Sequence, residues 1–140
     1  MSQTTLVFSI GPVQGFIAQS RRTADGWVGS YLLSYLMGHA LAAVESRSYV
    51  MRIVEPAVES RPSAMGTVGP HPRIPMYEAI KDRTGRKVAG DTTIAALPNV
   101  ALLEVQPGAE AVIAEAAQAA AEEAGWKPLC ARFGASFLTQ

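Results

Sequence analysis

The feature that most constrains this chain is a stretch rich in proline and glycine near its middle. Seven such residues fall within Glu55–Pro75: Pro56, Pro62, Gly66, Gly69, Pro70, Pro72 and Pro75. Proline removes a backbone donor and fixes φ, so this density is incompatible with long helices or strands. The elements that build a core must therefore lie on either side of a long irregular insertion near 55–96, in which only Met76–Ile80 suggests a helical turn.

The segment before the insertion begins with a strand. Thr4–Ile10 is a short β-branched and aromatic run, and Gly11-Pro12 closes it and offers a start for a helix. Apolar residues then recur at helical spacing as far as Glu45. One helix over that range would be about 50 Å long, too long for a domain of this size. We therefore expect two helices that meet near residues 23–26, with Thr23 or Asp25 as the second N-cap.

Small residues on the second helix, at Gly29, Ser30, Ser34 and Gly38, predict that another backbone approaches it closely. Ser48–Val54 reads as a second strand and Val100–Val105 as a third, entered through Leu97-Pro98-Asn99.

The last element that the pattern predicts with clarity is a helix. Gly108–Gly125 is rich in alanine and is expected to end on its glycine. The order strand, helices, strand, insertion, strand, helix predicts an α+β, ferredoxin-like (split βαβ) fold in a single domain over residues 1–140. A fourth strand would have to come from Ala135–Leu138, whose strand signal is weak, so the fold is expected to be incomplete.

Charge and composition limit the classes of function. Twelve Lys and Arg balance twelve Asp and Glu, which excludes the strongly basic footprint of most autonomous nucleic-acid-binding domains. A neutral surface with few charges favours self-association of the isolated chain. The N-terminus has no basic segment followed by an apolar one, and no uninterrupted apolar run reaches the length of a membrane span. These features predict a cytoplasmic protein with no membrane partner.

Motifs that carry chemistry are sparse. Gly11-Pro12 between a strand and a helix is either a tight turn or a phosphate-facing helix start. Arg21-Arg22 either interacts with the carbonyls at a helix end or contacts an anion or RNA phosphate. His39 is expected to be a packed helix residue and His71 to be solvated, and neither has a ligand partner at metal spacing. From residue types and spacing alone, the inference stops at an α+β domain.

The run Phe8–Leu36 carries more information. It contains Ile10-Gly11-Pro12-Val13-Gln14, the pair Phe16-Ile17 and the basic pair Arg21-Arg22. Asp25, Trp27 and Gly29-Ser30 follow, ahead of an apolar helix. This order resembles a signature of the large subunit of type III-B (Cmr-module) CRISPR effector complexes. There it opens the first palm-like domain of an RNA-guided antiviral machine.

The chain also departs from that family. The family's large subunit is several times longer and typically carries a nuclease-like domain, a zinc module and a second palm with a Gly-Gly-Asp-Asp metal site, and none of these motifs occurs here. The resemblance therefore implies a fragment that is not an enzyme and binds no metal by itself. A stand-alone nucleotidyl cyclase is disfavoured, because two-metal chemistry requires paired acidic ligands.

The resemblance also implies a site. In such subunits ATP binds between two palms, and the metal-bearing palm makes cyclic oligoadenylate signals from it. The resemblance therefore makes Ser9, Gly11, Gln14 and Arg21 candidates for the nucleotide-facing edge, with Arg22 a weaker one. ATP would bind only with the second palm present. Trp27, Tyr31, Leu32 and Tyr35 are expected to pack in the core or between domains. The implied partners are the rest of the large subunit, the other Cmr-module subunits and, indirectly, the CRISPR RNA and its target RNA. The alternative is a docking scaffold for neighbouring subunits and guide RNA that makes no nucleotide contact.

Overall fold

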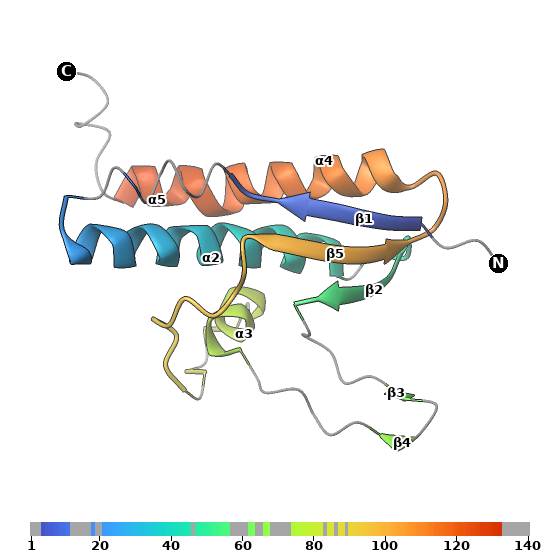
Figure 1. The fold of residues 1–140 in the computed structure, drawn as a ribbon, viewed down its shortest axis with the longest axis horizontal. Helices are drawn as coiled ribbons and strands as arrows, with labels where there is room; N and C mark the ends of the chain where they lie inside the picture. Colours follow the sequence, from blue (N-terminus) through green and yellow to red (C-terminus); the bar gives the residue numbers. More distant parts are fainter. Residues whose placement is uncertain are drawn as a thin grey trace.

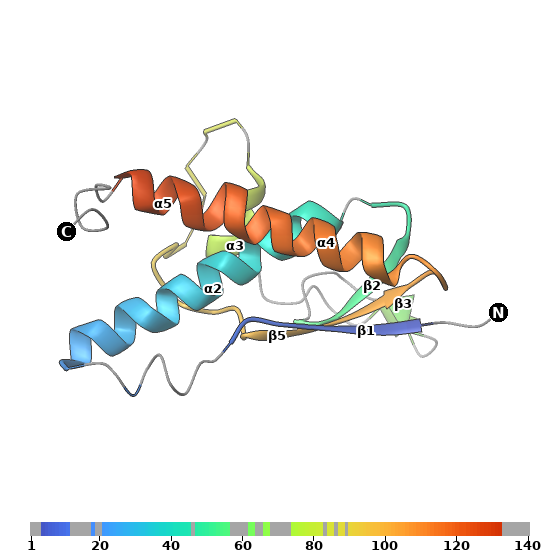
Figure 2. The ribbon, with the colours of Figure 1, turned by 90° about the horizontal axis from the view of Figure 1, so that it is seen from above.

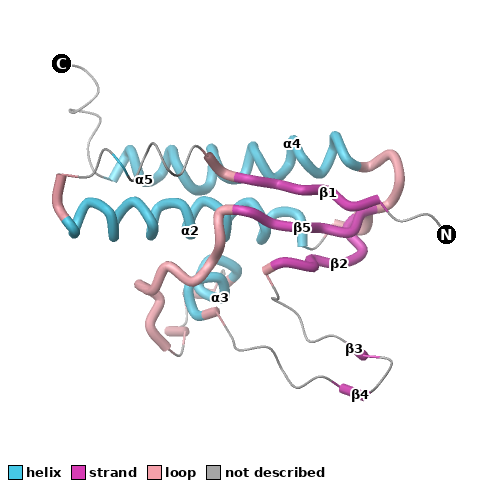
Figure 3. The backbone as a smooth tube through the Cα atoms, viewed as in Figure 1, coloured by secondary structure: helices cyan, strands magenta, loops and turns pink. Residues whose placement is uncertain are grey.

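The computed structural model describes residues 4–11, 18, 21–45, 47–56, 62–63, 66–67, 74–82, 84–85, 87–88 and 90–132. Its larger elements follow the expected order (Figures 1 and 3). They are β1 Thr4–Ser9, α2 Thr23–Glu45, β2 Val50–Glu55, α3 Pro75–Lys81, β5 Val100–Val105, α4 Glu110–Ala120, the π-helical segment η1 Ala121–Trp126 and α5 Lys127–Arg132.

The main sheet has three strands in the order β1-β5-β2. Strand β5 is antiparallel to both neighbours, with Leu6 opposite Leu103 in β1 and Ile53 opposite Leu103 in β2. Strands β1 and β2 are therefore parallel to each other, with a later strand inserted between them. This confirms the α+β class. The predicted fourth strand, Ala135–Leu138, lies outside the described residues.

The helices cover one face of this sheet. Helices α2 and α4 lie side by side on that face and run in opposite directions (Figures 1 and 2). The core between the layers is made of fully buried side chains from both: Met37, Leu41, Val44, Leu103, Val105 and Ile113. Strand β1 alternates accordingly, with Leu6 and Phe8 packed against the core and Thr5 and Val7 exposed. No described helix covers the opposite face.

Helix α2 is apolar on more than one side, because it contacts the sheet, α4, η1 and α3. Its segment Gly26–Glu45 has the length and mean hydropathy, 1.2, that a membrane-spanning helix requires. The expectation concerned uninterrupted apolar runs. This segment meets the test on average hydropathy, although glycine, serine and histidine interrupt it. The central helix of a packed domain passes the same test, and Ala40 and Leu41 of α2 are buried in the core.

The start of α2 also differs in detail from the prediction. The helix begins at Thr23, within the expected junction, but the N–H of Gly26 donates to the carbonyl of Arg22 at 3.3 Å. The residue whose carbonyl accepts the first helical hydrogen bond occupies the N-cap position. Arg22 is therefore the N-cap residue, and Thr23 and Asp25 lie inside the helix. The preceding helix expected after Pro12 falls mostly on residues that the structure does not describe.

The predicted end of the last helix at Gly125 is wrong. The chain passes from α4 through η1 into α5 and stays helical to Arg132. The N–H of Lys127 donates to the carbonyl of Glu122, five residues back, just before Pro128, which has no N–H to donate. Gly125 is buried because α2 approaches it: a Cβ there would lie 2.8 Å from Leu36 Cδ2. Gly125 therefore allows α2 to pack closely against η1, and it does not end the helix as its residue type predicted.

The described part of the insertion contains more structure than the proline density predicts. Strands β3 (Pro62–Ser63) and β4 (Gly66–Thr67) form a two-residue antiparallel ladder. The predicted turn at Met76–Ile80 is confirmed as α3, which begins on Pro75 and packs against α2. The insertion therefore contributes a wall to the domain.

Candidate functional site

A ladder of rings runs along α2. Trp27, Tyr31, Tyr35 and His39 are spaced by four residues, which places them on one face of a helix. The ring centroids of Trp27 and Tyr31 lie 5.8 Å apart and those of Tyr31 and Tyr35 6.2 Å apart, both stacked. Tyr35 and His39 meet edge to face at 4.5 Å. The ladder runs from the half-buried His39 to Trp27, which is 53% exposed.

The ladder forms one side of an open groove. Tyr31, Tyr35 and His39 face Ala79 and Ile80 of α3 and Thr92 of the following loop, around a cavity of about 260 Å³. This cavity approaches the lower end of the size range of ligand pockets, roughly 300–1,000 Å³. We call this feature the α2–α3 groove.

Small residues of α2 allow α3 and the loop before β5 to approach this helix closely. A Cβ on Gly38 would overlap the terminal methyl of Ile80, so a larger residue at this position would displace the Ile80 side chain. Four residues earlier, buried Ser34 donates from Oγ to the carbonyl of Leu97 at 2.6 Å and accepts from the Leu97 N–H at 3.2 Å. The predicted close approach of another backbone to the second helix is confirmed at Ser34, whereas Gly38 meets the side chains of Ile80 and Leu97. The partners are α3 and the loop that enters β5.

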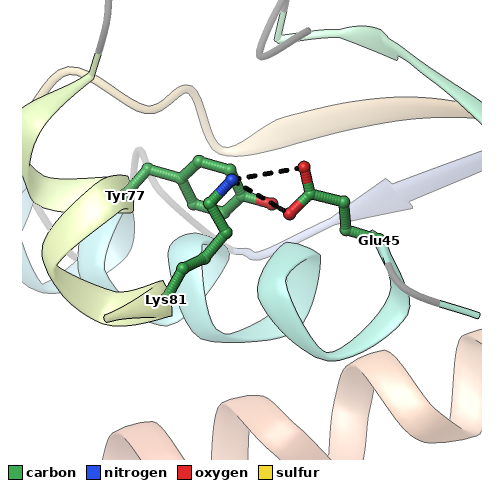
Figure 4. A network of polar contacts seen from close by, with 3 residues as sticks. All are labelled: Glu45, Tyr77 and Lys81. Atoms are coloured by element: carbon green, nitrogen blue, oxygen red, sulfur yellow. Dashed lines mark hydrogen bonds and ion pairs between the residues drawn. The ribbon is translucent and has the colours of Figure 1, made fainter. Parts of the chain in front are cut away.

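A polar network fixes α3 at the other end of α2. The hydroxyl of Tyr77 donates to Glu45 Oε2 at 2.8 Å, and Lys81 Nζ lies 3.3 Å from Oε1 and 3.2 Å from Oε2 of the same carboxylate (Figure 4). The Lys81 ammonium also lies 4.5 Å from the centroid of the Tyr77 ring. Charge-assisted hydrogen bonds of this kind are stronger than neutral ones. The groove is therefore held open by contacts outside it.

The chemistry of the groove centres on His39. Its Nε2 is buried and has no hydrogen-bond partner among the described residues. Burial lowers the pKa of His39 below its ordinary value of 6.5, since desolvation disfavours the imidazolium form. His39 is thus a neutral imidazole with an unused nitrogen beside apolar and aromatic walls. The rings of Tyr31 and Tyr35 can stack a planar or apolar group in the groove, whereas Nε2 of His39 is enclosed by the protein and is not available to such a group.

The predicted nucleotide-facing residues lie elsewhere. Ser9 is the last residue of β1, and its neighbour Ile10 extends the pairing by donating to the carbonyl of Asn99 at 2.9 Å. Ser9, Gly11 and Arg21 are exposed, and Gln14 lies outside the described residues. The end of β1 and the start of α2 lie well apart in both views (Figures 1 and 2). A joint contact of these residues with one nucleotide stays a prediction.

Within the described ranges, no group of three His, Cys, Asp or Glu side chains is placed to hold a metal ion. His39 is packed, as expected, while His71 lies outside the described residues.

The sequence reasoning found one side of the groove and missed the other. It assigned Trp27, Tyr31 and Tyr35 to packing, and the four-residue spacing that includes His39 was the signal for a continuous ladder. Ile80 and Thr92 come from the irregular insertion, where local pattern gives no indication of what they face.

Two comparisons with known proteins agree on the family. Residues 5–131 match the family described as CRISPR-associated protein Cmr2, N-terminal. The chain belongs to this family, and the resemblance drawn from Phe8–Leu36 is confirmed. It is 32% identical over 99 residues to the CRISPR system Cmr subunit Cmr2 of Pyrococcus furiosus. That alignment covers 71% of this chain and 10% of the relative, so the chain spans about a tenth of the length of the curated protein that it matches.

Proposed function

We propose that this chain is a palm-like, ferredoxin-like domain of a Cmr2-type large subunit and forms a non-catalytic wall of an ATP pocket. The observation that carries this proposal is the strand order β1-β5-β2, with β5 antiparallel to both neighbours. A helix-linked parallel pair with a later strand between them is the first half of a ferredoxin-like fold. A fourth strand beside β1 would complete it.

The proposed role is non-catalytic because of the sequence. Two-metal nucleotidyl chemistry uses acidic ligands around ions about 4 Å apart. No Asp-Asp pair follows glycines anywhere in the chain. In this proposal the catalytic acids belong to a second palm, and ATP binds only when both palms are present.

The nucleotide-facing edge of this palm is assigned to Ser9, Gly11, Gln14 and Arg21, with a smaller part for Arg22. The exposed position of Arg21 just before α2 supports the assignment. Arg21 precedes the first turn of α2, whose N–H groups and dipole add positive potential there, and this combination favours a phosphate.

The test uses the complete effector complex that contains the full large subunit. Arg21→Ala should lower cyclic oligoadenylate synthesis several-fold while complex assembly and RNA content stay unchanged, because one phosphate contact is lost. Arg47→Ala, which removes an exposed arginine beyond the other end of α2, is the matched control. Unchanged synthesis in the Arg21 variant would count against the pocket.

A second measurement uses the isolated chain. Calorimetry with ATP and magnesium should give weak binding or none, since half of the pocket is missing. Robust ATP turnover by the 140-residue chain would overturn the non-catalytic assignment.

The second candidate function is a docking scaffold for the other Cmr-module subunits and the guide RNA, with no nucleotide contact. Large exposed apolar side chains on the helical layer favour it: Trp27, Val28 and Trp126 are each about half exposed. Loss of assembly or RNA in the Arg21 variant, rather than loss of synthesis, would support this function. The expected cytoplasmic location belongs to either proposal and stays a prediction.

A further inference from the structure

We propose that the outer edge of β1 binds an extended strand from polypeptide that lies beyond residue 140 in the complete Cmr2-type large subunit. The inference rests on the proposed function in taking this chain as one domain of a longer subunit, and it does not depend on an ATP pocket. It identifies the backbone groups that would hold a fourth strand and the part of the subunit that would supply it.

Half of the backbone groups of β1 point away from its described neighbour, β5. The N–H of Ile10 donates to the carbonyl of Asn99, which continues the register of the two strands by one pair. Backbone groups of successive residues in an antiparallel ladder point alternately to the two sides. The N–H and C=O groups of Thr5, Val7 and Ser9 therefore point outward, where no described strand pairs with them, and all three residues are exposed.

The two edges of the sheet are protected to different degrees. Natural edge strands are blunted by proline, charged residues or β-bulges, which oppose pairing with another strand. Strand β2 contains Arg52, and its pairing with β5 is irregular at two places. Strand β1 has the sequence TTLVFS, without proline or charge, and pairs with β5 in an unbroken register. The edge of β1 is therefore the one suited to accept a further strand.

The core is also incomplete on the side of β1. In the central strand β5, the inward side chains of Leu103 and Val105 are at most 1% exposed, and Ile53 of β2 is 2% exposed. Leu6 and Phe8 of β1 pack against the same core but are only partly buried. An added strand with apolar residues at every second position would cover them, because side chains of paired strands meet on one face. These features specify the partner as an extended segment with alternating apolar residues.

The length of the last helical run places the donor strand further along the chain. Val105 lies opposite Thr4, so α4, which begins at Glu110, starts near the beginning of β1. The run from α4 to Arg132 then extends past the other end of β1 in both views (Figures 1 and 2). It is about 33 Å long and β1 about 17 Å, so the run ends about 16 Å beyond Ser9.

The segment Ala135–Leu138 is too close to the helix end to be that strand. Only two residues separate it from Arg132, and three steps of extended chain cover at most about 11 Å. The distance to be covered is about 16 Å along the sheet, and the separation between the helical and strand layers adds to it. While the helix extends to Arg132, the donor strand must therefore come from beyond residue 140.

A longer subunit can supply such a strand. The aligned region is 10% of the Pyrococcus furiosus relative, so nine tenths of that protein lies outside it. Polypeptide that continues past α5 would return at the Ser9 end and run toward Thr4, antiparallel to β1. Because it is tethered, it would pair at a high effective concentration. The added strand beside β1 would complete the ferredoxin-like order.

Hydrogen exchange resolved to single amides tests the proposal through this alternation. In the 140-residue chain at low concentration, the outward amides of Thr5, Val7 and Ser9 should exchange at least about a hundredfold faster than those of Leu6 and Phe8. In the complete large subunit, the outward amides should slow to the rates of their neighbours, while the amides of β2 stay unchanged. Fast exchange of the outward amides in the complete subunit, or slow exchange already in the short chain, would overturn the proposal.

A photo-cross-linker at Val7 identifies the donor. Val7 is 60% exposed, and its side chain would lie beside that of a residue paired with it. In the complete subunit we expect a cross-link to a peptide that follows residue 140, identified by mass spectrometry. Cross-links only to RNA, to another subunit or to a second copy of the domain would overturn the assignment. The same probe at Met51 of β2, which is 48% exposed, is the control and should not give that peptide.

The Arg21→Ala variant separates this proposal from the ATP pocket. If synthesis is intact in this variant while the outward amides of β1 are protected, the pocket fails and the added strand stands. If synthesis falls while those amides exchange fast, the added strand fails and the pocket stands.

Discussion

At the scale of single residues, Ser34 joins two parts of the chain that are 63 positions apart. Its side chain is 2% exposed, and its hydroxyl both donates to and accepts from the backbone of Leu97. A side chain in the middle of a helix thereby satisfies both backbone polar groups of Leu97, as a neighbouring strand would.

Ser34→Ala should lower the free energy of unfolding by about 1–3 kcal/mol, because it leaves the Leu97 N–H and carbonyl without these partners in a buried place. Urea denaturation followed by circular dichroism measures the change. Ser30→Ala is the matched control: Ser30 donates only to the carbonyl of Gly26 within the same helix, and alanine is the better helix former, so its effect should stay within about 0.5 kcal/mol. Equal losses in both variants would contradict the role of Ser34.

His39 makes the stability of the domain depend on pH. Its pKa is lowered in the folded state, so below pH 6.5 the unfolded chain takes up a proton that the folded chain does not. Stability should therefore fall as the pH drops from about 6.5 toward the lowered pKa, and His39 should contribute no slope above that range.

His39→Gln should flatten this dependence, because glutamine does not titrate. Unfolding midpoints of the two proteins between pH 8 and pH 5.5 test the expectation, and their difference at pH 8 corrects for any loss of packing. A parallel decline of both proteins would show that other groups are responsible.

At the scale of elements, α3 is the part of the insertion that belongs to the domain. Its position depends on Glu45, whose carboxylate accepts from Tyr77 and pairs with Lys81 (Figure 4). Tyr77 is buried and the carboxylate is mostly so, whereas Lys81 is partly exposed.

Glu45→Ala should destabilise the domain by about 1–3 kcal/mol, since it removes the acceptor of a buried hydroxyl together with an ion pair. Glu123→Ala is the control. It removes the pair with Lys127, in which both side chains are more than 60% exposed, so solvent screens the attraction and the loss of stability should be small. Chemical denaturation of both variants should separate them, and hydrogen exchange should locate the Glu45 effect in α3. Indistinguishable variants would mean that α3 is held by apolar contacts alone.

At the scale of the whole molecule, the two faces of the sheet have different surroundings. Helices cover one face (Figure 2). Val7 and Val100 lie on the other face and are 60% and 41% exposed. This face also carries the Arg52–Glu104 ion pair, and the chain has no net charge to oppose association through its exposed valines.

The isolated chain should accordingly self-associate with rising concentration, and sedimentation velocity measures this directly. The double variant Val7→Lys, Val100→Lys should shift the population toward monomer. The pair Ala111→Lys, Gln118→Lys adds the same charge to exposed positions of α4 and should have a smaller effect. If both pairs act equally, net charge rather than the open sheet face controls association.

Much of the architecture could be predicted from local pattern. Strand β5 was placed at Val100–Val105 without error, because a short apolar run entered through a proline has few other solutions. The second helix and the short helix after Pro75 were located within one or two residues for similar reasons. The candidate site was harder. The ring ladder is visible in the sequence as a four-residue repeat, but its opposite wall comes from a segment with no period.

What the sequence by itself determined is the set of elements, their order and the family, since periodicity, prolines and the Phe8–Leu36 signature are local properties of the chain. The tertiary structure alone decided which local predictions, such as a helix end at a glycine, did not hold. It also decided which segments pack against each other. Gly125 reads as a helix stop, yet it lies in a continuing helical segment because α2 packs against it beside Leu36. His39 reads as a core residue, yet it lines a groove because α3 returns to α2 from about forty residues along the chain. Contacts between distant segments depend on shape and burial, which no local pattern encodes.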